Sequence, residues 1–114
     1  MKARIPKTGG GAQNMNQMIK KAQKMQDEIT VLQEDIEARD FTASAGGGAV
    51  EVVMTGKKNI KSLTIKPEVV DPEDIEMLQD LIISAVNEAV TTIDTTTEAE
   101  MSKITGGVSL PGLF

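Results

Sequence analysis

The chain has 114 residues and a net charge of −5, and it contains no cysteine, no histidine and two aromatic residues, Phe41 and Phe114. It therefore lacks disulfides, thiolate nucleophiles, imidazole bases and the commonest transition-metal ligands. These absences predict a protein that is not an enzyme, with no catalytic residue, metal, cofactor or small-molecule substrate. No apolar run approaches the roughly 18 residues of a membrane helix and no secretion signal opens the chain, so a cytoplasmic protein without membrane contact is predicted.

The first thirteen residues are predicted to form a flexible basic arm, residues 1–13. The opening MKARIPKTGGGAQ combines a proline with three consecutive glycines and shows no apolar periodicity. Such a composition is typical of a mobile terminus. Asn14 is the expected N-cap of the helix that follows.

A heptad pattern dominates the segment MNQMIKKAQKMQDEITVLQEDIEAR, in which apolar residues recur at alternating spacings of three and four. This pattern predicts a helix from about Asn14 to Arg39 with one narrow apolar seam, which favours packing against another helix. Such a helix is about 39 Å long, whereas a typical strand spans about 17–20 Å, so half of it should overhang a small sheet. The seam consists of Met15, Met18, Ala22, Met25, Ile29, Leu32 and Ile36.

Three short strands are predicted next, at Phe41–Ala45, Val50–Met54 and Ile60–Ile65. The short connections predict an antiparallel meander, which is stable only if a helix covers one face. The glycines at 46–48 suit a tight hairpin turn or a backbone nest for phosphate. The hairpin turn is favoured, because a strand and not a helix follows them.

A second long helix is predicted from the Asp71-Pro72 start signal to Gly106. Aspartate is a favoured N-cap and proline a favoured first helical residue, and acids in the first turn suit the helix dipole better than they suggest a cation site. Past Val90 five threonines lower the helix propensity, so the helix should be kinked or broken there. Residues 106–114 are interpreted as a C-terminal tail.

These elements predict one α+β domain over residues 14–105, with a long N-terminal helix, a three-stranded antiparallel meander and a long, kinked or broken C-terminal helix. The segment from Ile29 to Ile36 is expected to cover the sheet beside Ile75–Ala89. The outer seam, from Met15 to Met25, is expected to face Ile93–Ile104. A homodimer is also predicted, because the sheet leaves edges unpaired and the aliphatic core is small.

Positive charge is concentrated at the start of the chain. Residues 1–26 carry six basic side chains and no acid, whereas residues 27–40 carry six acids and the single Arg39. Lysines on a helix usually form a solvated face, but the basic arm next to them favours a nucleic-acid contact. The candidate DNA-binding residues are Lys20, Lys21, Lys24, Lys2, Arg4 and Lys7.

Several motifs resemble those of the YbaB/EbfC family of nucleoid-associated proteins. They are the block Ala45-Gly46-Gly47-Gly48 with the strand after it, the segment from Pro67 to Asp71-Pro72, and the ending ITGGVSLPGLF. The resemblance implies a bacterial, nucleoid-associated protein of the cytoplasm, a tweezers-like homodimer with helical prongs that binds double-stranded DNA with little sequence preference and affects nucleoid organisation or gene expression. The chain departs from this pattern in TTIDTTTEAEMSKIT, whose only positive group is Lys103.

Two other hypotheses come from different classes. In the first, the protein is a non-enzymatic interaction module that docks a partner helix on the heptad seam, and the lysines only keep it soluble. In the second, it is a small hydrolase, which the absence of histidine and cysteine disfavours. Salt-sensitive retention of DNA would separate the DNA-binding hypothesis from the first.

Overall fold

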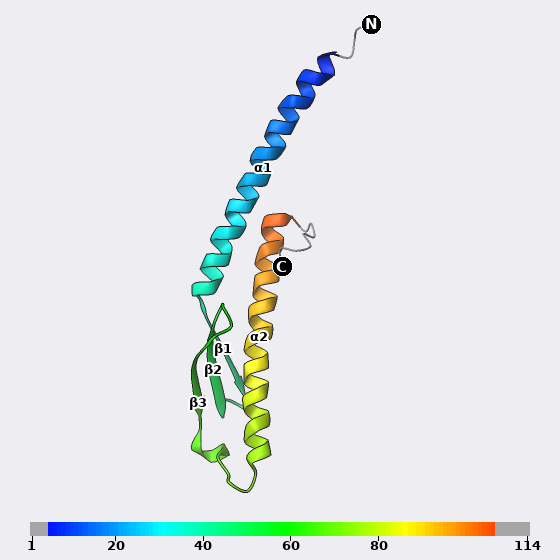
Figure 1. Cartoon of the computed structure of the whole chain (residues 1–114). Coiled ribbons are helices and arrows are strands. Elements are labelled where there is room, and N and C mark those ends of the chain that lie inside the picture. The colour runs from blue at the N-terminus through cyan, green and yellow to red at the C-terminus, as the bar shows by residue number, and fades with distance from the viewer. Residues whose placement is uncertain (1–4, 107–114) are drawn as a thin grey trace.

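The computed structural model describes residues 5–106, with side chains from residue 14 onward, as two long helices joined by a three-stranded sheet (Figure 1). The chain descends through α1, passes through the sheet and returns through α2, so the two helices are antiparallel. This confirms the α+β prediction of helix, meander and helix. The elements are α1 (Ile5–Ala38), β1 (Asp40–Ala45), β2 (Val50–Thr55), β3 (Ile60–Ile65), the 3-10 helix η1 (Pro67–Val69) and α2 (Ile75–Thr105).

The sheet is an antiparallel meander in the order β1-β2-β3, as predicted. Its two turns require left-handed backbone: the glycines at 46–48 have φ values of 62°, 67° and 93°, and Lys58 has φ 68°. Glycine adopts this conformation without a steric penalty, which confirms the predicted hairpin turn. One face of the sheet is buried under α2 and the other faces solvent. The residues packed between the sheet and α2 include Phe41, Ala43, Val50, Val52, Met54, Ala85, Ala89 and Ile93.

Helix α2 begins later than its start signal indicated. The predicted N-cap, Asp71, instead accepts a hydrogen bond from the Glu73 backbone N–H at 2.9 Å, which closes a turn ahead of the helix. The N-cap is Asp74, whose side chain accepts the Met77 N–H at 3.2 Å. Because aspartate stabilises both a helix start and a preceding turn, the sequence alone did not distinguish the two positions.

The predicted break in α2 was wrong, since the helix is continuous from Ile75 to Thr105. The Thr97 hydroxyl donates to the Ile93 carbonyl at 2.8 Å, so this threonine is satisfied within the helix. Ile93, Met101 and Thr105 are buried in the same stretch, and this packing outweighs the modest cost of β-branched residues. The helix ends at Gly106, as predicted, in the left-handed conformation.

Helix α1 begins at Ile5, ahead of the predicted start at Asn14. Glycine lowers helix propensity by about 1 kcal/mol but does not forbid elongation of a helix already formed, so the glycines at 9–11 did not mark its start. The division into an arm over 1–13, a domain over 14–105 and a tail over 106–114 stays a prediction.

Helix α1 packs on the C-terminal half of α2 and not across the sheet, which corrects the predicted placement of Ile29–Ile36 (Figure 1). Arg39 alone separates α1 from β1, and so short a connection sets the helix end-on above the sheet. At this junction Gly56 lies against the Ile36 backbone carbonyl, where a Cβ atom would clash. Only Ile36, at the end of α1, joins the core between the sheet and α2.

The resulting molecule is elongated, with extents of 89 × 21 × 18 Å and a radius of gyration of 23.4 Å. A compact domain of this length would have a radius of gyration of about 13 Å. The difference reflects the projection of α1 beyond the sheet, which was predicted, and beyond the end of α2, which was not. The seam is correspondingly divided: Ile29 is 2% exposed, whereas Met15 and Met18 are 63% and 67% exposed. These methionines were expected to face α2, but α2 ends before it reaches them.

Candidate nucleic-acid interface

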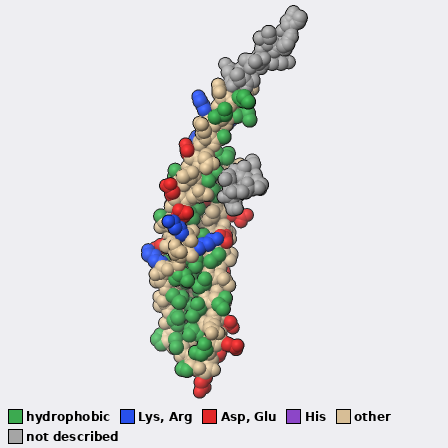
Figure 2. Space-filling view, in the orientation of Figure 1, with side chains coloured by type: hydrophobic (Ala, Val, Ile, Leu, Met, Phe, Trp, Pro, Cys, Tyr) green, Lys and Arg blue, Asp and Glu red, His purple; other side chains and the backbone are tan. Residues whose placement is uncertain are grey.

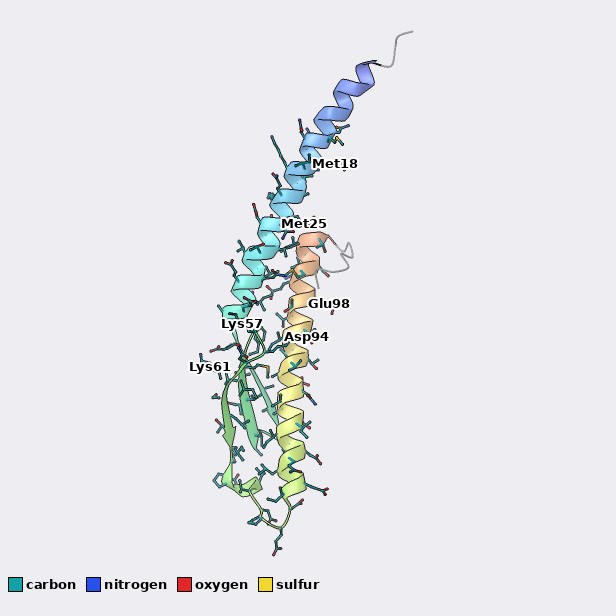
Figure 3. All side chains as sticks on the ribbon, in the orientation of Figure 1. Met18, Met25, Lys57, Lys61, Asp94 and Glu98 are labelled. Carbon is teal, nitrogen blue, oxygen red and sulfur yellow. The ribbon has the colours of Figure 1, made fainter. Side chains whose placement is uncertain are left out.

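The outer part of α1, residues 14–24, is called the prong here, and it carries Lys20, Lys21 and Lys24. Figure 3 labels Met18 on the prong and Met25 just after it. All three side chains are exposed, and Lys20 and Lys24 lie one helical turn apart. Lys21 and Lys24 border a hollow beside Ile104, so the lysines begin at the level where α2 ends. Among the described side chains, none of the ion pairs within 4.0 Å involves these three lysines.

The other predicted basic residues cannot be placed in the same way. Lys2 and Arg4 lie outside the described residues. Lys7 lies on the first turns of α1, and its side chain is outside the described part. The structure therefore brings together three of the candidate residues, and the contribution of the others stays a prediction.

Acidic side chains surround the prong lysines on the side nearer the sheet. Asp27 and Glu28 follow on the next turn of α1, and Asp94 and Glu98 lie on α2 further down (Figure 3). Lys103 adds one positive group near the end of α2. Figure 2 shows basic groups on the prong, acidic groups below them, and a second set of basic groups at the middle of the molecule. Phosphate is therefore attracted to the prong and repelled by much of the rest.

A second basic group lies at the β2–β3 turn, where Lys57 and Lys61 are exposed (Figure 3). Two lysines of this region are engaged by acids: Lys58 lies 2.7 Å from Asp94, and Lys61 lies 2.8 Å from Asp40. An ion pair lowers the net positive charge that a lysine offers to phosphate. This group is therefore the weaker candidate, and the pairing partners could not be read from the sequence.

An inter-helix clamp, formed by Asp35, Arg39 and Glu100, joins α1 to α2 below the prong. The Arg39 guanidinium donates two hydrogen bonds to Glu100, at 2.7 and 2.8 Å, and two to Asp35, at 2.8 and 3.4 Å. These hydrogen bonds hold the pKa of the Asp35 and Glu100 carboxyl groups below their usual range and raise that of Arg39. The clamp therefore fixes the direction in which the prong leaves the body.

An uncovered apolar surface lies on β3. Leu63 pairs with Val52, and Ile60 pairs with Met54. The side chains of Leu63 and Ile60 therefore lie on the inner face of the sheet, the face that carries Val52 and Met54. Whereas Val52 and Met54 are buried by α2, Leu63 is 40% exposed and Ile60 is 52% exposed. Helix α2 therefore covers β1 and β2. On β3 it leaves Ile60 and Leu63 exposed, whereas Ile65 is partly buried against the core.

The same surface continues onto α2. Ile83, Val90 and Asp94 are separated by seven and four residues, which places them on one side of the helix. The ion pair between Asp94 and Lys58 identifies that side as the one beside the β2–β3 turn. Ile83 is 55% exposed, and Figure 2 shows hydrophobic side chains gathered over this part of the body. Ile60, Leu63, Ile83 and Val90 are called the β3/α2 apolar face below.

Within the described residues, no cluster of three or more acidic side chains is arranged to hold a metal ion, and neither helix is long and apolar enough to cross a membrane.

The model of the YbaB/EbfC DNA-binding family matches residues 10–108 of the chain. The chain belongs to this family. Curated relatives agree: nucleoid-associated proteins of Ruminiclostridium cellulolyticum and Acetivibrio thermocellus are 58% and 56% identical to it over 107 and 114 residues. The first alignment covers 93% of each chain, and the second covers 99% of this chain and 98% of the relative. The resemblance inferred from the sequence motifs is thereby confirmed.

The YbaB/EbfC family member also shares its fold with a solved protein. The crystal structure of an uncharacterized protein from Helicobacter pylori aligns with a TM-score of 0.65, covering 78% of this chain and 94% of that one at 24% identity. The likeness supports the arrangement of helices and meander described above.

Proposed function

We propose that the protein binds double-stranded DNA with little sequence preference through the prongs of a homodimer, and that it thereby affects nucleoid organisation or gene expression. The observation that carries the proposal is a group of exposed lysines that form no ion pair with the described side chains, on a helix that projects from an acidic body. Family membership supports the same function, because the family is described as DNA-binding and the relatives are named nucleoid-associated proteins.

The chemistry of the prong favours contact with the DNA backbone. A lysine ammonium is a point charge on a flexible stem, which binds a phosphate oxygen without demanding one geometry. Phosphate contacts supply affinity and position but little sequence information. Within the described residues the one arginine, Arg39, is held by Asp35 and Glu100, so it is not free for bidentate contact with guanine.

The homodimer is proposed to form through the β3/α2 apolar face. A second copy related by a two-fold axis would place the same residues against one another and cover Leu63 and Ile83 on both chains. Burial of this face would also add to a core that is small for an elongated molecule. Two prongs would then project from one body and present their lysines to the same duplex.

The test is a binding titration of the full chain against two unrelated duplexes at two salt concentrations. We expect similar affinities for both duplexes and a marked loss of affinity at the higher salt concentration, because counterions are released when lysines bind phosphates. Absence of binding at low salt would overturn the proposal.

The exposed outer seam favours one alternative. Met15 and Met18 are 63% and 67% exposed, so they could receive a helix of a partner protein, as in the interaction-module hypothesis. Under that hypothesis, replacing the methionines with polar residues would abolish partner binding, while DNA would not be retained even at low salt.

A further inference from the structure

An open apolar groove runs along the flank of α1 beside the end of α2. It has a volume of about 460 Å³, and its apolar lining comes from Val31, Leu32 and Ile104. A smaller hollow of about 230 Å³ continues it toward the prong and shares Ile104 with it. The rim is formed by Lys24, Asp27, Glu28 and Asp35.

Val31 is the feature of this groove that lacks an explanation within the described residues. It is 65% exposed although Asp27 and Asp35 lie one helical turn before and after it, and it falls outside the heptad seam that α2 covers. Leu32 is only half-buried beside it. A branched aliphatic side chain on the wall of a groove is stabilised when an apolar segment covers it.

Helix α2 ends beside this groove. Gly106 adopts the left-handed conformation with φ 66°, and its N–H donates to the Ser102 carbonyl, which ends the helix and turns the backbone away from the helix axis. Ile104, on the last turn, already lines the groove. The described part of the chain therefore ends next to the groove.

Residues 107–114 have the composition and length that the groove requires. Their sequence, GVSLPGLF, contains four large hydrophobic residues and no charged side chain. Eight extended residues reach about 25 Å, whereas the groove from Lys24 to Asp35 follows α1 for about 17 Å. The segment is thus long enough to turn back at Gly106 and run along α1 past Val31.

We propose that residues 107–114 bind in this groove, with their hydrophobic side chains on Val31, Leu32 and Ile104. The occupant is the segment of the same chain, and the binding surface is the α1 flank. A segment bound in this way bridges the two helices above the inter-helix clamp and stiffens the base of the prong. The motif PGLF thereby acquires a role that DNA binding alone does not assign to it.

The test uses tryptophan fluorescence in the full chain. The sequence contains no tryptophan and no tyrosine, so Phe114→Trp introduces one fluorophore without a background signal. We expect its emission maximum to lie at shorter wavelength than that of the free peptide GVSLPGLW, and its quenching by acrylamide to be weaker. Both effects should be independent of protein concentration.

A second substitution locates the binding surface. Adding Val31→Asp should move the emission to that of the free peptide, whereas Gln33→Asp, which places the same charge on the other flank of α1, should leave it unchanged. Circular dichroism verifies that both variants keep their helices. Emission equal to that of the free peptide in the Phe114→Trp chain, or equal effects of the two aspartates, would overturn the proposal, as would a signal that appears only at high concentration.

An independent readout does not depend on either aspartate. Deleting residues 107–114 should change the methyl chemical shifts of Val31 and Ile104 and leave those of Val52, in the body core, unchanged. Unchanged shifts at Val31 and Ile104 would contradict the proposal.

Discussion

Replacing Lys20, Lys21 and Lys24 together with glutamine is expected to weaken DNA binding by a similar factor for unrelated duplexes and to flatten its dependence on salt. The three side chains are exposed and form no ion pair within the described part of the chain, so their removal should not disturb the fold. Glutamine keeps the length and helix propensity close to those of lysine.

The size of the effect follows from counterion release. Each phosphate contact contributes about 0.9 to the slope of log affinity against log salt concentration, so three contacts on one prong contribute roughly 2.7. Between about 50 and 200 mM salt, a slope of that size corresponds to a loss of affinity of about 40-fold that the variant should not show. An effect of this magnitude is measurable even if one of the lysines misses the DNA.

Fluorescence anisotropy with two labelled duplexes of unrelated sequence measures both the affinity and the slope. The matched control is a variant in which Lys57, Lys66 and Lys103 are replaced by glutamine, which changes the net charge equally but leaves the prong intact. A prong variant that is folded and dimeric yet keeps the original affinity and slope would refute the reasoning. Deleting residues 1–11 should act in the same direction as the prong variant, because it removes the remaining candidate basic residues.

Three further predictions concern assembly and stability. Sedimentation should give twice the chain mass of 12.2 kDa. Leu63→Glu should yield monomers, whereas Thr64→Glu, on the solvent face of β3, should not. A folded monomer of the native chain at micromolar concentration would contradict the dimer. Ile29→Ala should lower the free energy of unfolding by about 2–5 kcal/mol, because the Ile29 side chain is buried. Met18→Ala should change it by less than about 0.5 kcal/mol, because Met18 is exposed. Denaturant unfolding measures both, and equal small losses would show that the seam is not packed. Folding lowers the pKa of two carboxyl groups in the inter-helix clamp, those of Asp35 and Glu100. The contribution of the clamp to folding stability should therefore be complete above the unfolded pKa values and be lost as the pH falls through the lower pKa values of the folded state. Melting temperatures should fall below about pH 4, and less steeply in Glu100→Gln.

The strands and turns could be predicted because their signals are local. The alternation of apolar residues indicates the strand β2, and the glycines at 46–48 indicate the hairpin turn before it. Neither signal depends on distant parts of the chain. The continuity of α2 could not be predicted, because it depends on contacts that bury Ile93 and Met101. Propensity gives only a weak preference, which tertiary packing overrides.

The residues of the candidate site could be predicted from the sequence, but their surroundings in the fold could not. Clustered lysines and their acid-free neighbourhood are visible in the sequence, whereas the level at which α2 ends beside Lys21 and Lys24 is not. The clamp illustrates the same limit. The pairing of Arg39 with Asp35 follows from a spacing of four, but its pairing with Glu100 joins residues 61 positions apart.

Because a single residue, Arg39, connects α1 to the sheet, α1 can act as a lever arm about this residue. The Arg39 backbone N–H donates to the Ile36 carbonyl at 3.0 Å, and the Arg39 carbonyl accepts the Gly56 N–H at 3.1 Å. The Arg39 side chain also binds Glu100 on α2. Lys20 lies about 28 Å along the helix from this pivot, so a rotation of about 10° there would move the lysine by roughly 5 Å. That displacement is comparable to the spacing of successive phosphates on a DNA strand. Under the proposed function, the geometry at Arg39 would therefore determine how the prong meets the duplex, although Arg39 lies far from the lysines that are proposed to contact DNA.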